Sequence, residues 1–162
     1  MKYFFLLSMI FSICCSSCGS SSSSSNSQYQ DPHAAMHQEM HSELYQEQEQ
    51  NKLNGKWLIT QVYDMPVDST QFDGKQPLMM IDVSKGILTG NDGCNSFHGK
   101  VSFKNDKIVF GPTAGTLMAC SHMEISGKIL NSFNEKELTF ALKGLLFLFD
   151  GNQQAMVLKR AE

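Results

Sequence analysis

The sequence has no excess of positive charge. Its 162 residues carry 13 Lys and Arg against 16 Asp and Glu, which gives a formal net charge of −3. Proteins that bind nucleic acid usually present a basic face, so this balance argues against a nucleic-acid partner. It also argues against electrostatic docking on anionic lipid.

The sequence also lacks an N-terminal apolar run long enough for a permanent membrane span. The run from Tyr3 to Ile13 follows one positive charge at Lys2 and precedes small residues. A spanning helix needs about 20 apolar residues. A basic start, a short apolar core and small residues are typical of a secretory signal, so residues 1–17 are predicted to be a lipoprotein signal peptide.

A cysteine after this signal predicts a lipid anchor. Lipoprotein signals are cut before a cysteine preceded by small residues, as in Ser16-Ser17-Cys18-Gly19, whereas Cys14 and Cys15 lack small neighbours on their N-terminal side. We expect cleavage before Cys18 and lipid on its sulfur and new amine; ordinary cleavage to a soluble secreted protein is the alternative. Each buried methylene of the lipid contributes about 0.8 kcal/mol to membrane binding. No acidic run follows Cys18, which favours the periplasmic face of the outer membrane.

Cleavage would leave three cysteines and, by removing Lys2, change the formal charge from −3 to −4. With Cys18 acylated, Cys94 and Cys120 remain in an oxidising compartment, where an even pair suggests a disulfide.

Residues 18–52 are predicted to be a tether. The serine-rich stretch 19–30 is typical of a flexible linker. Asp31 can cap a helix and Pro32 suits its first turn, so a polar, acidic helix is expected over residues 32–49.

Three histidines on this helix make a candidate metal site. His33, His37 and His41 fall at i, i+4 and i+8, with Met36 and Met40 on the neighbouring stripe. Imidazole suits Zn(II) and Cu(II), and thioether suits Cu(I). The three histidines span roughly 12 Å of helix axis, so only a pair, with Met or Glu, could hold one ion. A tether with incidental histidines and a partner-docking helix remain alternatives.

Residues 53–162 are predicted to be mainly β. Gly, Asp, Asn and Pro separate short runs of β-branched, aromatic and aliphatic residues at 56–63, 77–83, 86–90, 100–103, 106–110, 137–143, 145–150 and 155–160. Hairpin signals at Lys85-Gly86, Asn105-Asp106 and Asp150-Gly151-Asn152 predict antiparallel neighbours. The uninterrupted run Leu145–Phe149 is expected to be buried on both faces. About eight strands in so short a segment predict a small antiparallel barrel.

One helix should interrupt the strands and cover an end of this barrel. Ser121 and Glu124 have the spacing of a capping box. An apolar face at helical spacing then follows, formed by Ile125, Ile129, Leu130 and Phe133.

The barrel interior is expected to be filled by side chains, with a small-ligand cavity as the alternative. The expected core residues are Trp57, Ile59, Met79, Ile81, Phe103, Phe110, Phe140, Leu146 and Leu148, or their neighbours.

Two motifs and the opening of this region resemble the META domain. The matching residues are Gly55-Lys56-Trp57, Gly93, Cys94, Asn95, Gly99, Thr116, Met118, Ala119, Cys120 and Glu124, with Leu117 where a basic residue is common. This family includes the HslJ heat-shock lipoproteins of bacteria. The resemblance covers residues 53–160 and implies a lipocalin-like barrel with one helix. It implies no established activity, but an association with envelope or heat stress.

Three interpretations of Cys94 and Cys120 are open: a structural disulfide, two free structural thiols, or a reactive Cys120 with His98 or His122 as its base. A disulfide would stabilise the fold by about 3–4 kcal/mol, and is favoured. Asn95 is predicted to be a turn residue whose amide bonds nearby backbone. Thr116 is expected at a strand edge and Met118 in the core.

These patterns favour a non-enzymatic envelope lipoprotein with a binding or supporting role under stress. The alternative is a periplasmic module that binds copper, zinc or a small ligand through the tail or the barrel mouth. An enzyme is the least favoured class. No cofactor is expected except a metal ion on the tail. The expected partners are the membrane, through the anchor, and an envelope protein; the oligomeric state stays open.

Overall fold

The computed structural model describes residues 32–162, with side chains from residue 40 onward. The predicted signal peptide, Cys18 and the serine-rich linker lie outside the described residues. The elements are α1 (Pro32–Asn51), β1 (Gly55–Val62), β2 (Met65–Pro66), the 3-10 helix η1 (Ser69–Phe72), β3 (Leu78–Asp82), β4 (Ile87–Asn91), β5 (Ser96–Lys104), β6 (Lys107–Gly115), α2 (Met123–Asn131), β7 (Glu137–Lys143), β8 (Leu145–Asp150) and β9 (Gln153–Arg160). The polar helix predicted over 32–49 is therefore present.

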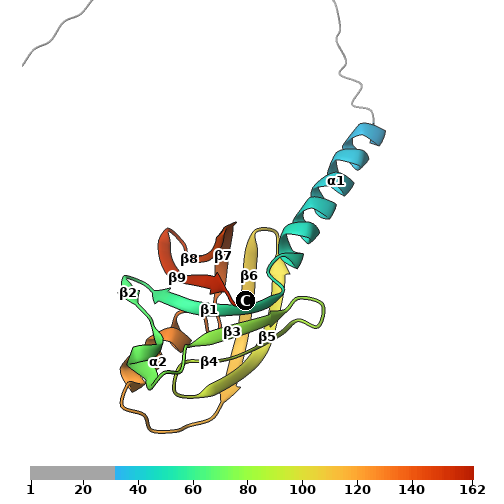
Figure 1. Cartoon of the computed structure of the whole chain (residues 1–162). Helices are drawn as coiled ribbons and strands as arrows, with labels where there is room; N and C mark the ends of the chain where they lie inside the picture. The colour runs from blue at the N-terminus through green and yellow to red at the C-terminus, as the bar shows by residue number, and fades with distance from the viewer. Residues whose placement is uncertain (1–31) are drawn as a thin grey trace, which may run out of the picture.

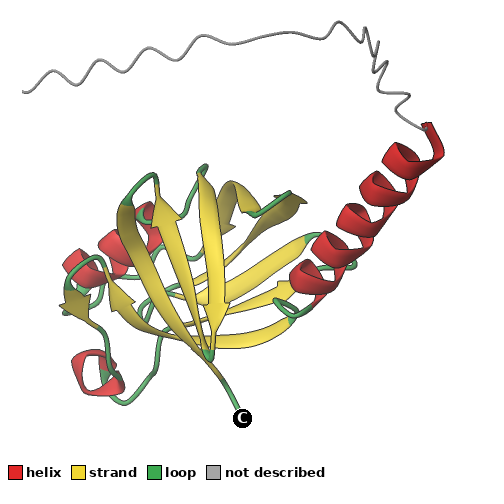
Figure 2. Ribbon diagram, turned by 90° about the horizontal axis from the view of Figure 1, so that it is seen from above, coloured by secondary structure: helices red, strands yellow, loops and turns green. Residues whose placement is uncertain are grey.

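The strands form one closed antiparallel sheet. Their order is β2-β1-β3-β4-β5-β6-β7-β8-β9, and β1 also pairs with β9, which closes the ring. The two-residue β2 pairs with the end of β1, so eight strands make the barrel wall (Figures 1 and 2). This confirms the predicted barrel. Among the described helices, none is long and apolar enough to cross a bilayer.

The barrel interior is filled by the inward-facing side chains of the strands. Seven of the nine expected core residues are buried: Trp57, Ile59, Met79, Ile81, Phe110, Leu146 and Leu148. Phe103 and Phe140 are only half-buried and pack at the edge of this cluster. The expectation that the interior is filled is confirmed, and the placement of these two aromatic residues in it is corrected.

The apolar run of β8 is buried on one face, not two. Leu146 and Leu148 are fully buried, whereas Leu145, Phe147 and Phe149 alternate with them and are half-exposed. A strand in a single-layered barrel wall has only its inner face covered, so the prediction of two buried faces was wrong.

α2 covers one end of the barrel, as predicted. Ile129 is fully buried, and the ring of Phe133, just after the helix, lies 5.3 Å from those of Phe97 and Phe110. Pairing between β6 and β7 is confined to three residue pairs. Beyond it, Asn134 accepts hydrogen bonds from the backbone N–H and the hydroxyl of Thr113, and so joins the end of the helical segment to β6.

The predicted capping box of α2 is absent. The helix begins at Met123 with His122 as N-cap, and no side chain caps it. Glu124 is therefore the second residue of the helix, one position before the third residue, which completes a capping box. Its carboxylate instead accepts a hydrogen bond from Lys128 Nζ at 2.8 Å, one helical turn away.

α1 extends from the opposite side of the barrel (Figures 1 and 2). The guanidinium of Arg160 on β9 donates to the carbonyls of Lys52 and Asn54 and lies 4.4 Å from the centre of the Trp57 ring. Trp57 in turn donates its indole N–H to the carbonyl of Leu53, which is fully buried. These contacts satisfy carbonyls that follow the helix, and they set the direction in which α1 leaves the barrel.

Candidate functional site

The first candidate site is the disulfide end of the barrel, formed by residues 92–95, residues 116–120 and the start of α2. Cys94 and Cys120 form a disulfide with a Cα–Cα distance of 5.9 Å. It ties the turn before β5 to the segment that leads into α2. The favoured interpretation of the two cysteines is confirmed.

A buried carboxylate organises the turn that carries Cys94. Asp92 is only 4% exposed, and its Oδ1 accepts the backbone N–H groups of Cys94 and Asn95 at 2.8 and 2.6 Å. Its carbonyl accepts a hydrogen bond from the Ser126 hydroxyl on α2. Asp92 thus fixes the turn and links it to the helix.

Asn95 connects this turn to the second motif segment. Its Oδ1 accepts hydrogen bonds from the Thr116 hydroxyl at 2.9 Å and from the Met118 backbone N–H at 2.7 Å. The predicted bonding of Asn95 to backbone is confirmed, although its partner is 23 residues away. Thr116 donates its N–H to the Ser96 carbonyl, so it extends the edge of β6, as expected.

Met118 does not fill the core. Its side chain is 52% exposed and that of Leu117 is fully exposed. The Met118 N–H donates to Asn95 Oδ1, and this bond holds the segment on the rim. The prediction of a core position was therefore wrong.

Two motif glycines allow close packing at this end. Gly93 has φ +91°, and a Cβ there would lie 2.2 Å from Phe72 Cδ1. Gly99, on β5, faces Thr113 of β6, where a Cβ would be 3.1 Å from the Pro112 carbonyl oxygen. Ala119 is exposed on the connecting segment.

The geometry offers no support for a reactive cysteine. The sulfur of Cys120 is bonded to Cys94. The His122 ring lies edge-on to Phe72, with 5.9 Å between ring centres. His98 is exposed on β5, opposite Thr89 and Ala114. In this oxidised form, Cys120 offers neither histidine a thiol to activate.

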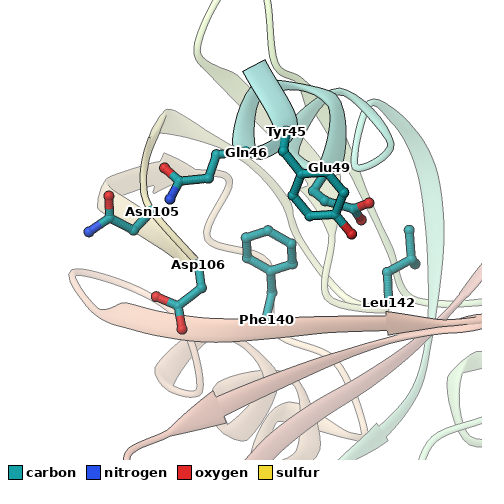
Figure 3. A pocket seen from close by; sticks show the side chains of 7 residues that line it. All are labelled: Tyr45, Gln46, Glu49, Asn105, Asp106, Phe140 and Leu142. Atoms are coloured by element: carbon teal, nitrogen blue, oxygen red, sulfur yellow. The ribbon is translucent and has the colours of Figure 1, made fainter. Parts of the chain in front are cut away.

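The second candidate site lies at the other end, beneath the last turns of α1. We call it the mouth pocket. It has a volume of about 570 Å³ and is lined by Tyr45, Gln46, Glu49, Asn105, Asp106, Phe140 and Leu142. Figure 3 shows these side chains arranged around the Phe140 ring. They come from α1, from the turn between β5 and β6, and from β7.

Ion pairs surround the mouth pocket. Glu49 pairs with Lys52 at 2.5 Å, and this hydrogen bond raises the pKa of the lysine. Lys107, next to Asp106 in the chain, pairs at 2.5 Å with Glu137, which raises the pKa of Lys107 and lowers that of the glutamate. Lys52 and Lys107 therefore already have carboxylate partners.

Comparison with known proteins identifies the folded region. The family model of the META domain matches residues 48–162. The chain belongs to the META domain family. The resemblance seen in the sequence is therefore confirmed. No curated protein matches the chain.

Two solved structures share the fold of this META barrel. One is an NMR structure of a protein from Burkholderia xenovorans, 22% identical, with a TM-score of 0.55 over 69% of this chain and 86% of that one. The other is also an NMR structure, 22% identical, with a TM-score of 0.53 over 67% of this chain and 90% of that one. At this identity the likeness shows the fold alone.

The predicted metal site lies largely outside the described side chains. α1 is continuous through the positions of His33, His37 and His41, but among these only the side chain of His41, which is exposed, is described. Within the described part of the chain, no group of three or more His, Cys, Asp or Glu side chains is placed to hold a metal. The tail site stays a prediction.

Several residues that build the two ends of the META barrel were not identified from the sequence. The sequence analysis predicted neither the buried role of Asp92 nor the link that Asn134 makes to β6. The mouth pocket was expected only as an unspecified cavity. Its hairpin turn, Asn105-Asp106, was recognised as a turn but not as part of a site.

Proposed function

We propose that this META domain protein is a non-enzymatic lipoprotein of the cell envelope. It is anchored through lipid on Cys18 in the outer membrane, facing the periplasm. There it binds or supports other envelope components under stress. The lipoprotein-type segment 1–18 and the serine-rich linker after it support the anchor.

The observation that carries this proposal is the disulfide between Cys94 and Cys120. Disulfides persist in oxidising compartments such as the periplasm and are rare in the cytosol. Because both cysteine sulfurs of the folded domain are used in this bond, they serve as a structural link rather than as nucleophiles. This favours a binding or supporting protein over a thiol enzyme.

Anchoring is tested by fractionating cells that express the protein or its Cys18→Ser variant. The wild-type protein is expected in the membrane fraction with a lipid mass on its N-terminal peptide, and the variant in the soluble fraction or unprocessed. Cys14→Ser is the matched control and should remain anchored. A Cys18→Ser protein that still carries lipid would contradict the proposal.

The stress role is tested in cells that lack the protein. Heat or detergent challenge is expected to lower their survival. Wild-type protein should restore it, and Cys18→Ser should not. Equal survival with and without the protein would contradict a supporting role.

A second candidate function is binding of a small ligand at the barrel mouth. The observation that favours it is the mouth pocket, whose volume of about 570 Å³ falls within the usual range for small-molecule sites. The hypothesis that the N-terminal helix binds copper or zinc is tested separately, by calorimetric titration with each metal. Replacing His33, His37 and His41 with alanine should abolish that binding; unchanged binding would exclude a tail site.

A further inference from the structure

The mouth pocket combines an apolar floor with an acidic rim. Phe140 and Leu142 continue the inward-facing series of β7 beyond the fully buried Leu138. They reach the barrel end, where they are only half-buried. The Tyr45 side chain of α1 is 62% exposed and stands over this floor beside Phe140 (Figure 3). The pocket therefore offers two aromatic rings to a ligand.

The polar groups of the pocket favour a cation. Two of its seven residues, Glu49 and Asp106, are carboxylates, two are amides, and none of the seven carries a positive charge. The helix that forms one wall has four glutamates and no Lys or Arg. Lys52 is paired with Glu49 and Lys107 with Glu137. Lys104 and Lys143, which flank Asn105 and Leu142 in sequence, do not line the pocket. Glu49 shares its charge with Lys52, and the charge of Asp106 contributes to the raised pKa of Lys107.

The walls of the pocket are held in place from both sides. Gln50, one position after Glu49, donates its side-chain amide to the Asn105 carbonyl at 3.1 Å. Arg160 ties the residues after α1 to β9. The helix wall and the hairpin wall are thus joined directly, so that Glu49 and Asp106 stand on either side of Phe140 before any ligand arrives (Figure 3).

We propose that the mouth pocket binds a small organic cation, in which a protonated amine is carried on an apolar or aromatic body. The amine lies between the carboxylates of Glu49 and Asp106 and near the faces of Tyr45 and Phe140. Aromatic faces attract cations through their negative quadrupole. The apolar body covers Phe140 and Leu142. This inference deepens the small-ligand function proposed above and rests on it.

The test is an NMR titration of the purified, oxidised protein with three probes of similar size: phenethylammonium, 3-phenylpropionate and 2-phenylethanol. Phenethylammonium is expected to shift the signals of Tyr45, Asn105 and Phe140 and to bind most tightly. Equal binding of all three probes at these residues would overturn the preference for a cation while leaving a small-ligand site. No shift at these residues with any probe would overturn both.

Charge variants sharpen this test. The double variant Glu49→Gln/Asp106→Asn is expected to weaken phenethylammonium binding by roughly fivefold, as expected for two exposed charge pairs. Its binding of 2-phenylethanol should not change. The matched control is Glu43→Gln, which makes the same charge change on α1 outside the pocket and should leave both affinities unaltered. Weakening of both probes alike, or an equal loss in the control, would contradict the proposal.

Discussion

The two ends of this META barrel are covered by helices of different character. At the disulfide end, α2 contributes Ile129 to the core and is followed by Phe133, both fully buried, and a covalent bond joins two segments of the rim. At the other end, α1 is polar, exposes Leu44 and Tyr45, and reaches the barrel through hydrogen bonds from Gln50 and Arg160. The disulfide end stabilises the fold, whereas the end beneath α1 contains the open mouth pocket.

The largest loss of stability is expected from removing one aromatic ring from the core at the disulfide end. Phe133→Ala removes a ring packed against Phe97 and Phe110, and should lower the free energy of unfolding by about 3–5 kcal/mol. Urea denaturation monitored by circular dichroism measures this. Phe147→Ala, on the half-exposed outer face of β8, is the control and should cost clearly less. An equal loss of unfolding free energy in the two variants would mean that the packing of Phe133 does not stabilise this end more than an outward-facing ring does.

Removal of the disulfide should have the next largest effect. The two cysteines are separated by 26 residues in sequence, and losing this closed loop is expected to cost about 3–4 kcal/mol in the double variant Cys94→Ser/Cys120→Ser. Denaturation under non-reducing conditions measures the loss. Wild-type protein treated with reductant should lose a similar amount. A stability equal to that of the oxidised wild type would show that the bond adds nothing to this end.

A smaller effect is expected where α1 joins the barrel. Arg160→Gln loses the bonds to the Lys52 and Asn54 carbonyls and the contact with the Trp57 ring. Because the side chain is exposed, the expected cost in unfolding free energy is about 1 kcal/mol. Thermal unfolding measures it. The neighbouring exposed change Lys159→Gln should lie within about 0.5 kcal/mol of wild type. A cost for Arg160→Gln near that of Phe133→Ala would contradict the contrast between the ends.

The smallest effect concerns Asp82, the last residue of β3. The next two residues, Val83 and Ser84, line a groove along α1. Hydrogen bonds from Ser84 and Lys85 lower the pKa of Asp82 from 3.8 to about 2. Ser84→Ala should raise this pKa toward its ordinary value, as NMR titration of the carboxyl carbon would show. An unchanged pKa would mean that Ser84 is not the main cause.

The same shift sets a direction for pH dependence. Since the folded pKa of Asp82 lies below the unfolded one, its contribution to stability is present above about pH 4 and is lost as the pH falls to about 2. Ser84→Ala should therefore flatten the pH dependence of stability in this window. A steeper dependence in the variant would contradict the assignment.

Local pattern was enough to predict most of the barrel. The strands around Trp57, Phe110 and Leu146 were predicted from β-branched and aromatic runs between turn residues. Such strand and turn signals depend only on residues that are close in sequence. The disulfide followed from an even pair of cysteines in a predicted oxidising compartment. A hydrogen bond between the Asn95 side chain and backbone was also predicted. That its partner would be the distant Met118 N–H was not.

What could not be predicted depends on contacts between distant segments. The apolar run of β8 does not reveal whether a second layer covers its outer face, so Phe147 was expected to be fully buried. The mouth pocket brings Tyr45 of α1 to Phe140 of β7. That meeting is set by the direction in which α1 leaves the barrel. Arg160, more than 100 residues later in the sequence, helps to fix this direction. No local periodicity encodes such an arrangement.

Native-state hydrogen exchange of the oxidised protein tests most directly whether the two ends differ. Amides of α2, such as that of Ser126, which bonds to the His122 carbonyl, are expected to exchange only through global unfolding. Amides of residues 44–49 in α1 should exchange much faster, through local opening of the helix. Equal protection of α1 and α2, or faster exchange in α2, would contradict the account.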